Sequence, residues 1–485
     1  MNTPIARLFV VSMLMFASLI GATSWWTVVK ADSLNRDHPN INQRDLLRSL
    51  RIKRGAIRAA DNVILARSVK DSEGVYSRAY PTHKLFGHPV GYSFTATGQQ
   101  TGLEAFYNHD LSGTPGDAST LFGELTGRAS PGRNLKTTLD PRAQQVATTA
   151  LEAAGGTGGS AVALDPRTGA VKVMVSVPGL DPDAVRTKQG LAAANRDNVN
   201  HPLVNRAVQF GYAPGSTFKV VTLTAALDSG RYTLNSQVDA TNDVKISGVP
   251  LPNDFNKSFG RIDLKTALAQ SVNTAYAQVA EKLGKPLLRQ YMERFGFDHK
   301  PQLDYPKDTM SASGEYRNGK LLDPASTFAD VGRMGIGQDK LVVTPLQMAQ
   351  VAAAVANGGT LMKPHLADRF VDADGRTTKT IDPQVQSHVM SAQTAAAVRD
   401  AMVAVVQSGT GTKAQIPGVT VAGKTGTAET ETGQNTKNKL WFIAFAPAEN
   451  PKVAVAVTVD NAVGFGGDFA APVAKQIIEE LLKNV

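Results

Sequence analysis

The feature that most constrains this chain is an uncharged stretch close to its N-terminus. Residues 8–29 contain no charged side chain. The stretch is as long as the roughly 20 apolar residues that a helix needs to cross the hydrocarbon core of a bilayer. Trp25 and Trp26 stand near its far end, and aromatic side chains of this kind favour the membrane interface. We therefore expect residues 1–30 to form a short cytoplasmic tail and a transmembrane anchor.

The same stretch also fits a cleaved signal peptide. Ala22, Thr23 and Ser24 form a small-x-small pattern of the kind that signal peptidases cut. We favour the uncleaved anchor because the apolar run continues past this pattern to Val29. Basic residues lie on both sides of the run, so charge does not fix its orientation. We expect the body of the chain on the extracytoplasmic side of the cell membrane because of the motifs described below.

Composition narrows the chemistry that the body can perform. The chain has 485 residues and no cysteine, which excludes a thiol nucleophile, disulfides and cysteine-bound metal clusters. Any covalent catalysis must then use serine, threonine, lysine or a carboxylate. The net charge of +9 comes without a long basic run or basic-aromatic interleaving, so nucleic acid is not an expected partner. With no H-E-x-x-H motif either, we expect no metal and no cofactor.

The body divides by pattern into two parts. Residues 31–133 are polar and weakly periodic, with short strands expected at 63–66 and 76–80, and we expect them to form an N-terminal pedestal domain. A basic cluster at Arg48, Arg51, Lys53, Arg54 and Arg58 fits either a solvated face or contact with anionic lipid headgroups. Residues 134–485 have clearer periodicity and form the second, larger domain.

The periodicity of the larger domain predicts an α+β fold. It indicates helices over 141–154, 217–228, 264–270, 274–283, 345–357 and 472–483. It indicates strands over 160–164, 170–177, 419–426, 440–446 and 452–459, the first two forming a hairpin. A hairpin, a helical middle, three more strands and a closing helix favour an antiparallel sheet sandwiched by helices.

One phosphate-binding motif occurs in an unsuitable context. Residues 418–425 match G-x-x-x-x-G-K-[ST]. A phosphate loop needs a helix that begins at its Lys-Thr pair, because the helix N-terminus faces the phosphates. Here a Gly- and Thr-rich stretch follows Thr425, and it predicts the end of a strand and a turn. We therefore interpret this segment as a strand and not as a nucleotide site.

Three short motifs together favour a serine nucleophile. Ser216 begins an apolar helix, and Lys219 shares its helix face, so the lysine amine can act as the base that the hydroxyl needs. Ser271 and Asn273 form an S-x-N motif between two helices, suited to proton relay and substrate positioning. Lys424, Thr425 and Gly426 form a K-T-G motif in a strand. In this order the motifs match the set of serine β-lactamases and penicillin-binding proteins.

Beyond these motifs, the chain resembles a class B penicillin-binding protein, a monofunctional peptidoglycan D,D-transpeptidase. The resemblance rests on segments 102–108, 164–170, 205–207, 212–219, 335–338, 344–349 and 422–429. The compact form is similar to that of the actinobacterial transpeptidases of elongation and division. The pedestal is short for the family and indicates no large dimerisation insertion. Two segments depart from the family pattern. Residues 60–63, which follow Arg54-Gly55-Ala56-Ile57, lack the usual glycine, and Asp339 stands where the family often has glycine.

The resemblance implies a transpeptidation mechanism and its residues. Ser216 attacks peptidoglycan stem peptides ending in D-Ala-D-Ala, with Lys219 as base and Ser271 and Lys424 handling the leaving group. Asn273, Thr425, Gly426 and Thr427 bind the substrate, and the backbone N–H groups of Ser216 and Thr427 hold the oxyanion. β-Lactam antibiotics act as covalent inhibitors, and a membrane glycosyltransferase of the elongation or division machinery is the expected partner. A D,D-carboxypeptidase, a β-lactamase and a non-catalytic cell-wall scaffold remain the alternatives.

Overall fold

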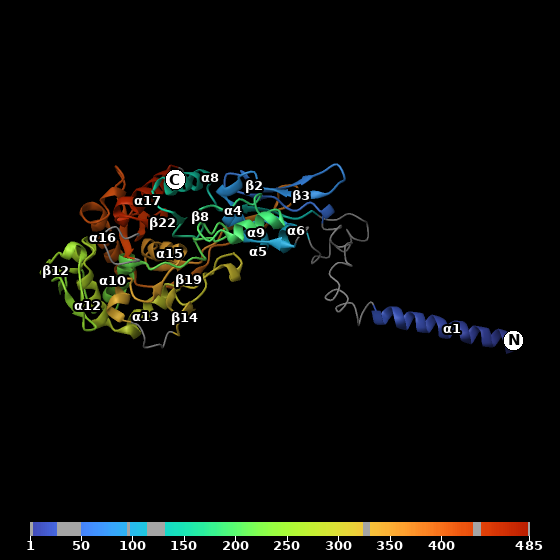
Figure 1. Ribbon diagram of the computed structural model, residues 1–485, viewed down its shortest axis with the longest axis horizontal. Helices are drawn as coiled ribbons and strands as arrows, with labels where there is room; N and C mark the ends of the chain where they lie inside the picture. The colour runs from blue at the N-terminus through green and yellow to red at the C-terminus, as the bar shows by residue number, and fades with distance from the viewer. Residues whose placement is uncertain are drawn as a thin grey trace.

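The structure is a computed structural model, which describes residues 3–26, 50–94, 98–113, 131–323, 330–429 and 438–483. The N-terminal helix α1 (Thr3–Ser24) lies apart from the body of the protein, and its side chains are exposed along its length (Figure 1). With a mean hydropathy of 2.1 in its most apolar window, it is long and apolar enough to cross a membrane. Residues 27–29 of the expected apolar run lie outside the described residues.

A five-stranded antiparallel sheet forms the centre of the larger domain. Its strand order is β20-β21-β22-β7-β8. The strands are β7 (Gly158–Leu164), β8 (Val171–Val177), β20 (Ala422–Glu429), β21 (Asn438–Ala446) and β22 (Val453–Ala462). The predicted hairpin is confirmed, since β7 pairs with β8 in antiparallel register. Strand β20 occupies one edge of this sheet, which leaves its outer side available to other groups.

Helices cover both faces of this sheet. Alternate side chains of β22 enter two different cores: Val455 and Val457 pack with α8 (Pro141–Ala153) and α17 (Gly466–Leu482), whereas Ala454 and Ala456 pack with α15 (Pro345–Ala356). Figure 1 shows α8 and α17 on one side of β22 and α15 on the other. The expected α+β sandwich is therefore confirmed.

The last helix begins earlier than the sequence predicted. We expected it to start at Pro472, because proline favours the first turn of a helix. It starts instead at Gly466, and Pro472 lies inside it. A Cβ at Gly466 would lie 2.2 Å from the carbonyl oxygen of Trp441 and 2.4 Å from that of Gly426. The start of α17 is thus fixed by close packing against the sheet, a tertiary contact that the local pattern does not reveal.

A helical region packs against the α15 side of the sheet. It comprises α10 (Lys219–Asp228), α11 (Leu264–Ala269), α12 (Asn273–Leu283), α13 (Lys285–Arg294), α14 (Val331–Gly335) and α16 (Ala392–Ser408). Helix α10 is buried over most of its length, as expected for a helix without a polar face. The first turn of the helix predicted over 217–228 is a separate 3-10 turn, η3 (Gly215–Phe218).

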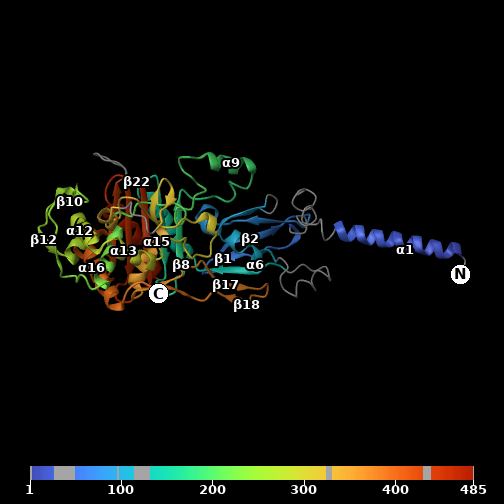
Figure 2. The same cartoon turned by 90° about the horizontal axis from the view of Figure 1, so that it is seen from below.

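A second, six-stranded sheet lies between α1 and the helix-covered sheet (Figure 2). Its order is β18-β17-β6-β1-β2-β3. The strands are β1 (Ile57–Arg58), β2 (Ile64–Lys70), β3 (Tyr76–Ala79), β6 (Asn134–Thr137), β17 (Ala367–Val371) and β18 (Thr377–Thr380). The sheet combines segments from both sides of the expected boundary at residue 133, and the division into 31–133 and 134–485 stays a prediction.

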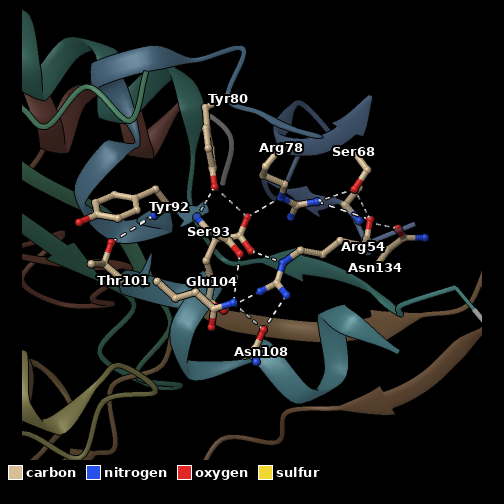
Figure 3. A network of polar contacts seen from close by, with 12 residues as sticks. Arg54, Ser68, Arg78, Tyr80, Tyr92, Ser93, Thr101, Glu104, Asn108 and Asn134 are labelled. Carbon is tan, nitrogen blue, oxygen red and sulfur yellow. Dashed lines mark hydrogen bonds and ion pairs between the residues drawn. The ribbon is translucent and has the colours of Figure 1, made fainter. Parts of the chain in front are cut away.

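A buried ion-pair network joins the elements of this region (Figure 3). Glu104 of α5 (Gly102–Phe106) is fully buried, and its two carboxylate oxygens accept from Arg54 Nε at 2.7 Å and Arg78 Nε at 2.6 Å. Burial alone would raise the pKa of Glu104, but the charges of Arg78 and Arg54 outweigh it and hold this pKa below its usual value. Arg54 is therefore part of the folded interior, and its assignment to an exposed basic cluster was wrong.

The two departures from the family pattern have a common conformation. Asn62, in the turn between β1 and β2, has φ +73°, and Asp339 has φ +64°. Asparagine and aspartate tolerate this left-handed region better than other residues with a Cβ, because their short side chains bond to the nearby backbone. Both positions therefore keep the turn that glycine would provide.

We expect Glu104→Ala to destabilise the protein by about 3–5 kcal/mol, because it leaves two poorly exposed arginines without a counter-charge. Glu73→Ala removes an exposed carboxylate from the β2–β3 turn and serves as the control. Urea denaturation of both variants measures the difference. Equal stabilities of the two variants would contradict the importance of the network.

Candidate active site

The proposed nucleophile Ser216 lies in η3, directly before α10. Gly215 has φ +53°, and a Cβ there would lie 2.7 Å from the carbonyl oxygen of Thr427. The N–H of Gly215 also donates to the carbonyl oxygen of Gly337 at 3.0 Å. A left-handed glycine and two close backbone contacts thus hold Ser216 against the edge strand β20.

Lys219 is fully buried and touches the serine one helical turn away. Its Nζ donates to Ser216 Oγ at 2.9 Å, to the backbone oxygen of Ser271 at 2.6 Å and to Asn273 Oδ1 at 2.7 Å. Burial lowers the pKa of Lys219 to about 7, and the negative charge of Asp254 opposes this effect. A substantial fraction of this amine is therefore neutral near pH 7 and able to accept a proton.

Ser271 and Asn273 come from the joint between α11 and α12. Ser271 has φ +58°, a strained conformation for serine that surrounding contacts must maintain. Its Oγ lies 3.5 Å from Nζ of Lys219 and accepts from Lys424 Nζ at 2.9 Å. Asn273 is the first residue of α12, and its side chain faces Lys219. The joint thus places one hydroxyl between two lysine amines.

Lys424 lies on β20 and is fully buried. Burial, followed by the nearby charge of Lys219, lowers the pKa of Lys424 well below its usual value. Its Nζ also donates to the carbonyl oxygen of Thr425 at 3.0 Å. Since β20 continues as a strand through Lys424 and Thr425, no helix begins there, and the strand interpretation of the phosphate-loop pattern is confirmed.

An open cleft of about 260 Å³ runs past these groups. The expected site residues that line it are Ser216, Ser271, Asn273, Thr425, Gly426 and Thr427. Lys219 and Lys424 lie beneath its surface and reach it through Ser216 and Ser271. The fold thus brings all eight expected residues together, although Ser216 and Thr427 are 211 positions apart in the sequence. The catalytic and binding roles assigned to them stay a prediction.

The cleft also contains residues that the sequence reasoning missed. Asp254 and Phe255 come from η4 (Asp254–Asn256), Thr410 follows α16, and Phe465 and Asp468 flank the start of α17. The Oγ1 atoms of Thr410 and Thr425 are 2.6 Å apart, and the rings of Phe255 and Phe465 lie 5.3 Å apart. No recognised motif marks these positions, because tertiary contacts alone bring them to the cleft.

The polar groups form a continuous path for protons. Ser216, Lys219, Ser271 and Lys424 are linked in that order by contacts of 2.9, 3.5 and 2.9 Å. In the described part of the chain, the group best spaced to hold a metal ion is His83, Asp181 and Asp183, with ligand atoms within 4.8 Å of one another. None of these three residues lines the cleft. The cleft geometry suits covalent catalysis by serine with lysine as the base.

Gly337 supports the nucleophile through close backbone packing. Its φ is +81°, and a Cβ there would lie 1.9 Å from the carbonyl oxygen of Gly215. Gly375 has φ +84° and open space around it, so it provides a matched control for backbone strain. We expect Gly375→Ala to cost about 1 kcal/mol of stability and Gly337→Ala roughly 1–3 kcal/mol more, because Gly215 must move. Thermal unfolding measures both losses of stability. Equal losses would show that the close packing of Gly337 on Gly215 adds no cost of its own.

Comparisons with known proteins agree with this geometry. Residues 159–479 match the penicillin binding protein transpeptidase domain family. Residues 54–135 match the penicillin binding protein A dimerisation domain family, in the segment where we expected no large dimerisation insertion. The chain is 36% identical over full length to the peptidoglycan D,D-transpeptidase PbpA of Mycolicibacterium smegmatis. It is 34% identical, again over the full length of both chains, to PbpA of Mycobacterium tuberculosis.

A solved structure shows the same architecture. Penicillin-binding protein A from M. tuberculosis, in its penicillin G acyl-enzyme complex, superposes with a TM-score of 0.77 at 33% identity. The match covers 89% of this chain and 100% of the other. With a matching domain family over most of the larger domain and full-length relatives above 30% identity, the chain belongs to the penicillin-binding protein transpeptidase family.

Proposed function

We propose that this chain is a peptidoglycan D,D-transpeptidase that works through an acyl-enzyme on Ser216. The observation that carries the proposal is the buried Lys219 amine, 2.9 Å from Ser216 Oγ and with a pKa of about 7. The names of the relatives and the penicillin G acyl-enzyme of M. tuberculosis penicillin-binding protein A support the same chemistry.

Acylation would proceed in two proton-coupled steps. Neutral Lys219 takes the proton of Ser216 Oγ as this oxygen attacks the carbonyl carbon between the two terminal D-alanines. The backbone N–H groups of Ser216 and Thr427 stabilise the oxyanion. The proton then passes from Lys219 to Ser271 and to the leaving D-alanine amine, along the path that the hydrogen bonds define. Lys424 supports Ser271 from the other side.

The donor peptide would bind along β20. This is an edge strand, so a peptide can pair with its outer side at Gly426 and Thr427. The hydroxyls of Thr425 and Thr427 would receive the terminal carboxylate, and Asn273 would hold the stem peptide. A β-lactam would enter by the same route and remain as the acyl-enzyme.

The membrane setting and the partner of this chain are part of the same proposal. Helix α1 would anchor the protein as a single-pass membrane protein, with the pedestal of residues 31–133 and the transpeptidase domain of residues 134–485 on the extracytoplasmic side. A membrane glycosyltransferase of the elongation or division machinery would supply the glycan strands that this domain cross-links. A β-lactamase would release the penicillin adduct rapidly and a scaffold would form none, which the first experiment below measures. A carboxypeptidase would differ by transferring the acyl group to water in place of an amine.

We expect the full-length protein in detergent to gain the mass of a fluorescent penicillin, and Ser216→Ala to gain none. Ser229→Ala, which removes a hydroxyl at the other end of α10, is the matched control and should be labelled normally. Intact-protein mass spectrometry over time detects the adduct. A long-lived adduct supports the transpeptidase, rapid release supports a β-lactamase, and no Ser216-dependent adduct refutes the enzymatic role.

The pH dependence of acylation should report on Lys219. Only the neutral amine accepts a proton, and its fraction grows as the pH rises through its pKa. We therefore expect the acylation rate to rise with pH around an apparent pKa of about 7 and then to level off. Lys219→Arg should slow acylation by at least about 100-fold and remove this rise, because the guanidinium keeps its proton. A wild-type rate that does not vary with pH would contradict this assignment.

A further inference from the structure

Asp254 is a carboxylate in the cleft that the acylation chemistry above does not use. It lines the cleft together with Ser216, Ser271 and Asn273. It is exposed, and it forms no ion pair with any residue in the part of the chain that the structure describes. Its negative charge opposes part of the lowering of the pKa of Lys219 and Lys424, and its Oδ1 lies 3.4 Å from the side chain of Asn273. An exposed acid beside two buried amines requires an explanation.

The backbone around Asp254 is held rigidly in a strained conformation. Phe255 and Asn256, the next two residues, have φ values of +58° and +53°. Buried Asn253 fixes the segment, since its side chain donates to the carbonyl oxygens of Ala240 and Lys257 and accepts from the N–H of Thr274. Strain of this kind persists where contacts over-determine the conformation, and it is concentrated at functional sites.

Asn273 connects Asp254 to the catalytic groups. Its Oδ1 accepts from Lys219, while its Nδ2 donates to the carbonyl oxygen of Pro252 at 3.2 Å and to Asp254 Oδ1 at 3.4 Å. One side chain thus sets the position of the base and of the carboxylate. The second oxygen of Asp254 has no hydrogen bond among the described residues and can accept from a bound molecule.

The other acid of the cleft is already neutralised. Asp468 Oδ1 lies 2.7 Å from Lys413 Nζ, and both residues line the cleft. Asp254 is therefore the carboxylate of the cleft best able to attract a cation. The acceptor of a transpeptidase is a primary amine, which arrives protonated at neutral pH, as the usual pKa of lysine illustrates, and must lose a proton before it attacks.

We propose that Asp254 binds the acceptor, the primary ammonium group of a neighbouring stem peptide, and holds it against the acyl-enzyme. This inference rests on the proposed transpeptidase function and specifies its second substrate. The Asp254 carboxylate accepts from the ammonium group, and the Asn273 Nδ2 that donates to Asp254 Oδ1 holds this carboxylate in position. The exposed ring of Phe255, which contacts the Phe465 ring in a tilted arrangement at the cleft, would pack against the aliphatic part of the incoming side chain.

The transfer step balances in protons and bonds. The ammonium first loses one proton to solvent beside the exposed Asp254. The neutral nitrogen attacks the ester carbonyl carbon of acylated Ser216, forming a C–N bond. The second proton passes from this nitrogen through neutral Lys219 to Ser216 Oγ as the C–O bond breaks. The products are a new amide and the free serine.

The test measures how often the acyl group of the acyl-enzyme is transferred to an amine and how often it is transferred to water. The full-length protein is acylated by an acyl-D-alanine thioester in the presence of either glycinamide, a cationic acceptor at neutral pH, or hydroxylamine, a neutral one. The ratio of aminolysis to hydrolysis is read from the products, and it is independent of the acylation rate. We expect Asp254→Asn to lower this ratio about tenfold for glycinamide, as loss of a charge-assisted hydrogen bond predicts, and to leave it unchanged for hydroxylamine.

Two further variants serve as controls. Asp254→Glu keeps the charge and should restore most of the glycinamide ratio, whereas Asp468→Asn makes the same charge change in the same cleft and should leave the ratio as it is. A glycinamide ratio that Asp254→Asn does not change would overturn the inference. An equal fall of the ratio for glycinamide and hydroxylamine would also overturn it, because Asp254 would then act by changing the pKa of the lysines and not by binding the ammonium group. Wild-type protein without a penicillin adduct would instead refute the proposed function itself.

Discussion

The burial of an amine against a serine is the interaction on which the site depends. Lys219 reaches Ser216, Ser271 and Asn273 from the first turn of α10, a helix that has almost no exposed surface. Lys219 is fully buried, so its charged amine loses hydration that its neutral acceptors replace only in part. The neutral form gains relative stability, and an ordinary lysine becomes a base near pH 7.

This burial requires close approach of three distant parts of the chain. The turn at Gly215 packs on the backbone of Thr427, Gly337 packs on Gly215, and Gly466 packs on Gly426. Each contact brings one backbone to a distance that a Cβ would prevent. Glycine at these positions is therefore a condition for the cleft, because it allows the nucleophile, the edge strand and the last helix to meet.

The charged groups of the cleft differ in sign and in burial from one part of the cleft to another. Lys219 and Lys424 are buried, and their lowered pKa values reduce the positive charge beneath Ser216 and Ser271. Asp254 is exposed on η4, and Asn273 connects it to Lys219. In the proposed reaction, anionic and cationic substrate groups would therefore occupy different places in one cleft. Arg54 and Arg78, in contrast, pair with buried Glu104 and join elements of the fold.

The sequence alone predicted most helices and strands of the larger domain and the candidate reactive residues. Periodicity predicted the hairpin β7–β8, the strand nature of β20 and most helices, because side-chain spacing reflects which face of an element is buried. Motif spacing predicted Ser216 and Lys219 as neighbours, because residues three apart share a helix face. Only the tertiary structure decided that Arg54 pairs with buried Glu104, that α17 starts at Gly466, and that Asp254 and Thr410 join the cleft. These features depend on contacts between residues far apart in the chain, and local pattern carries no information about distance in space.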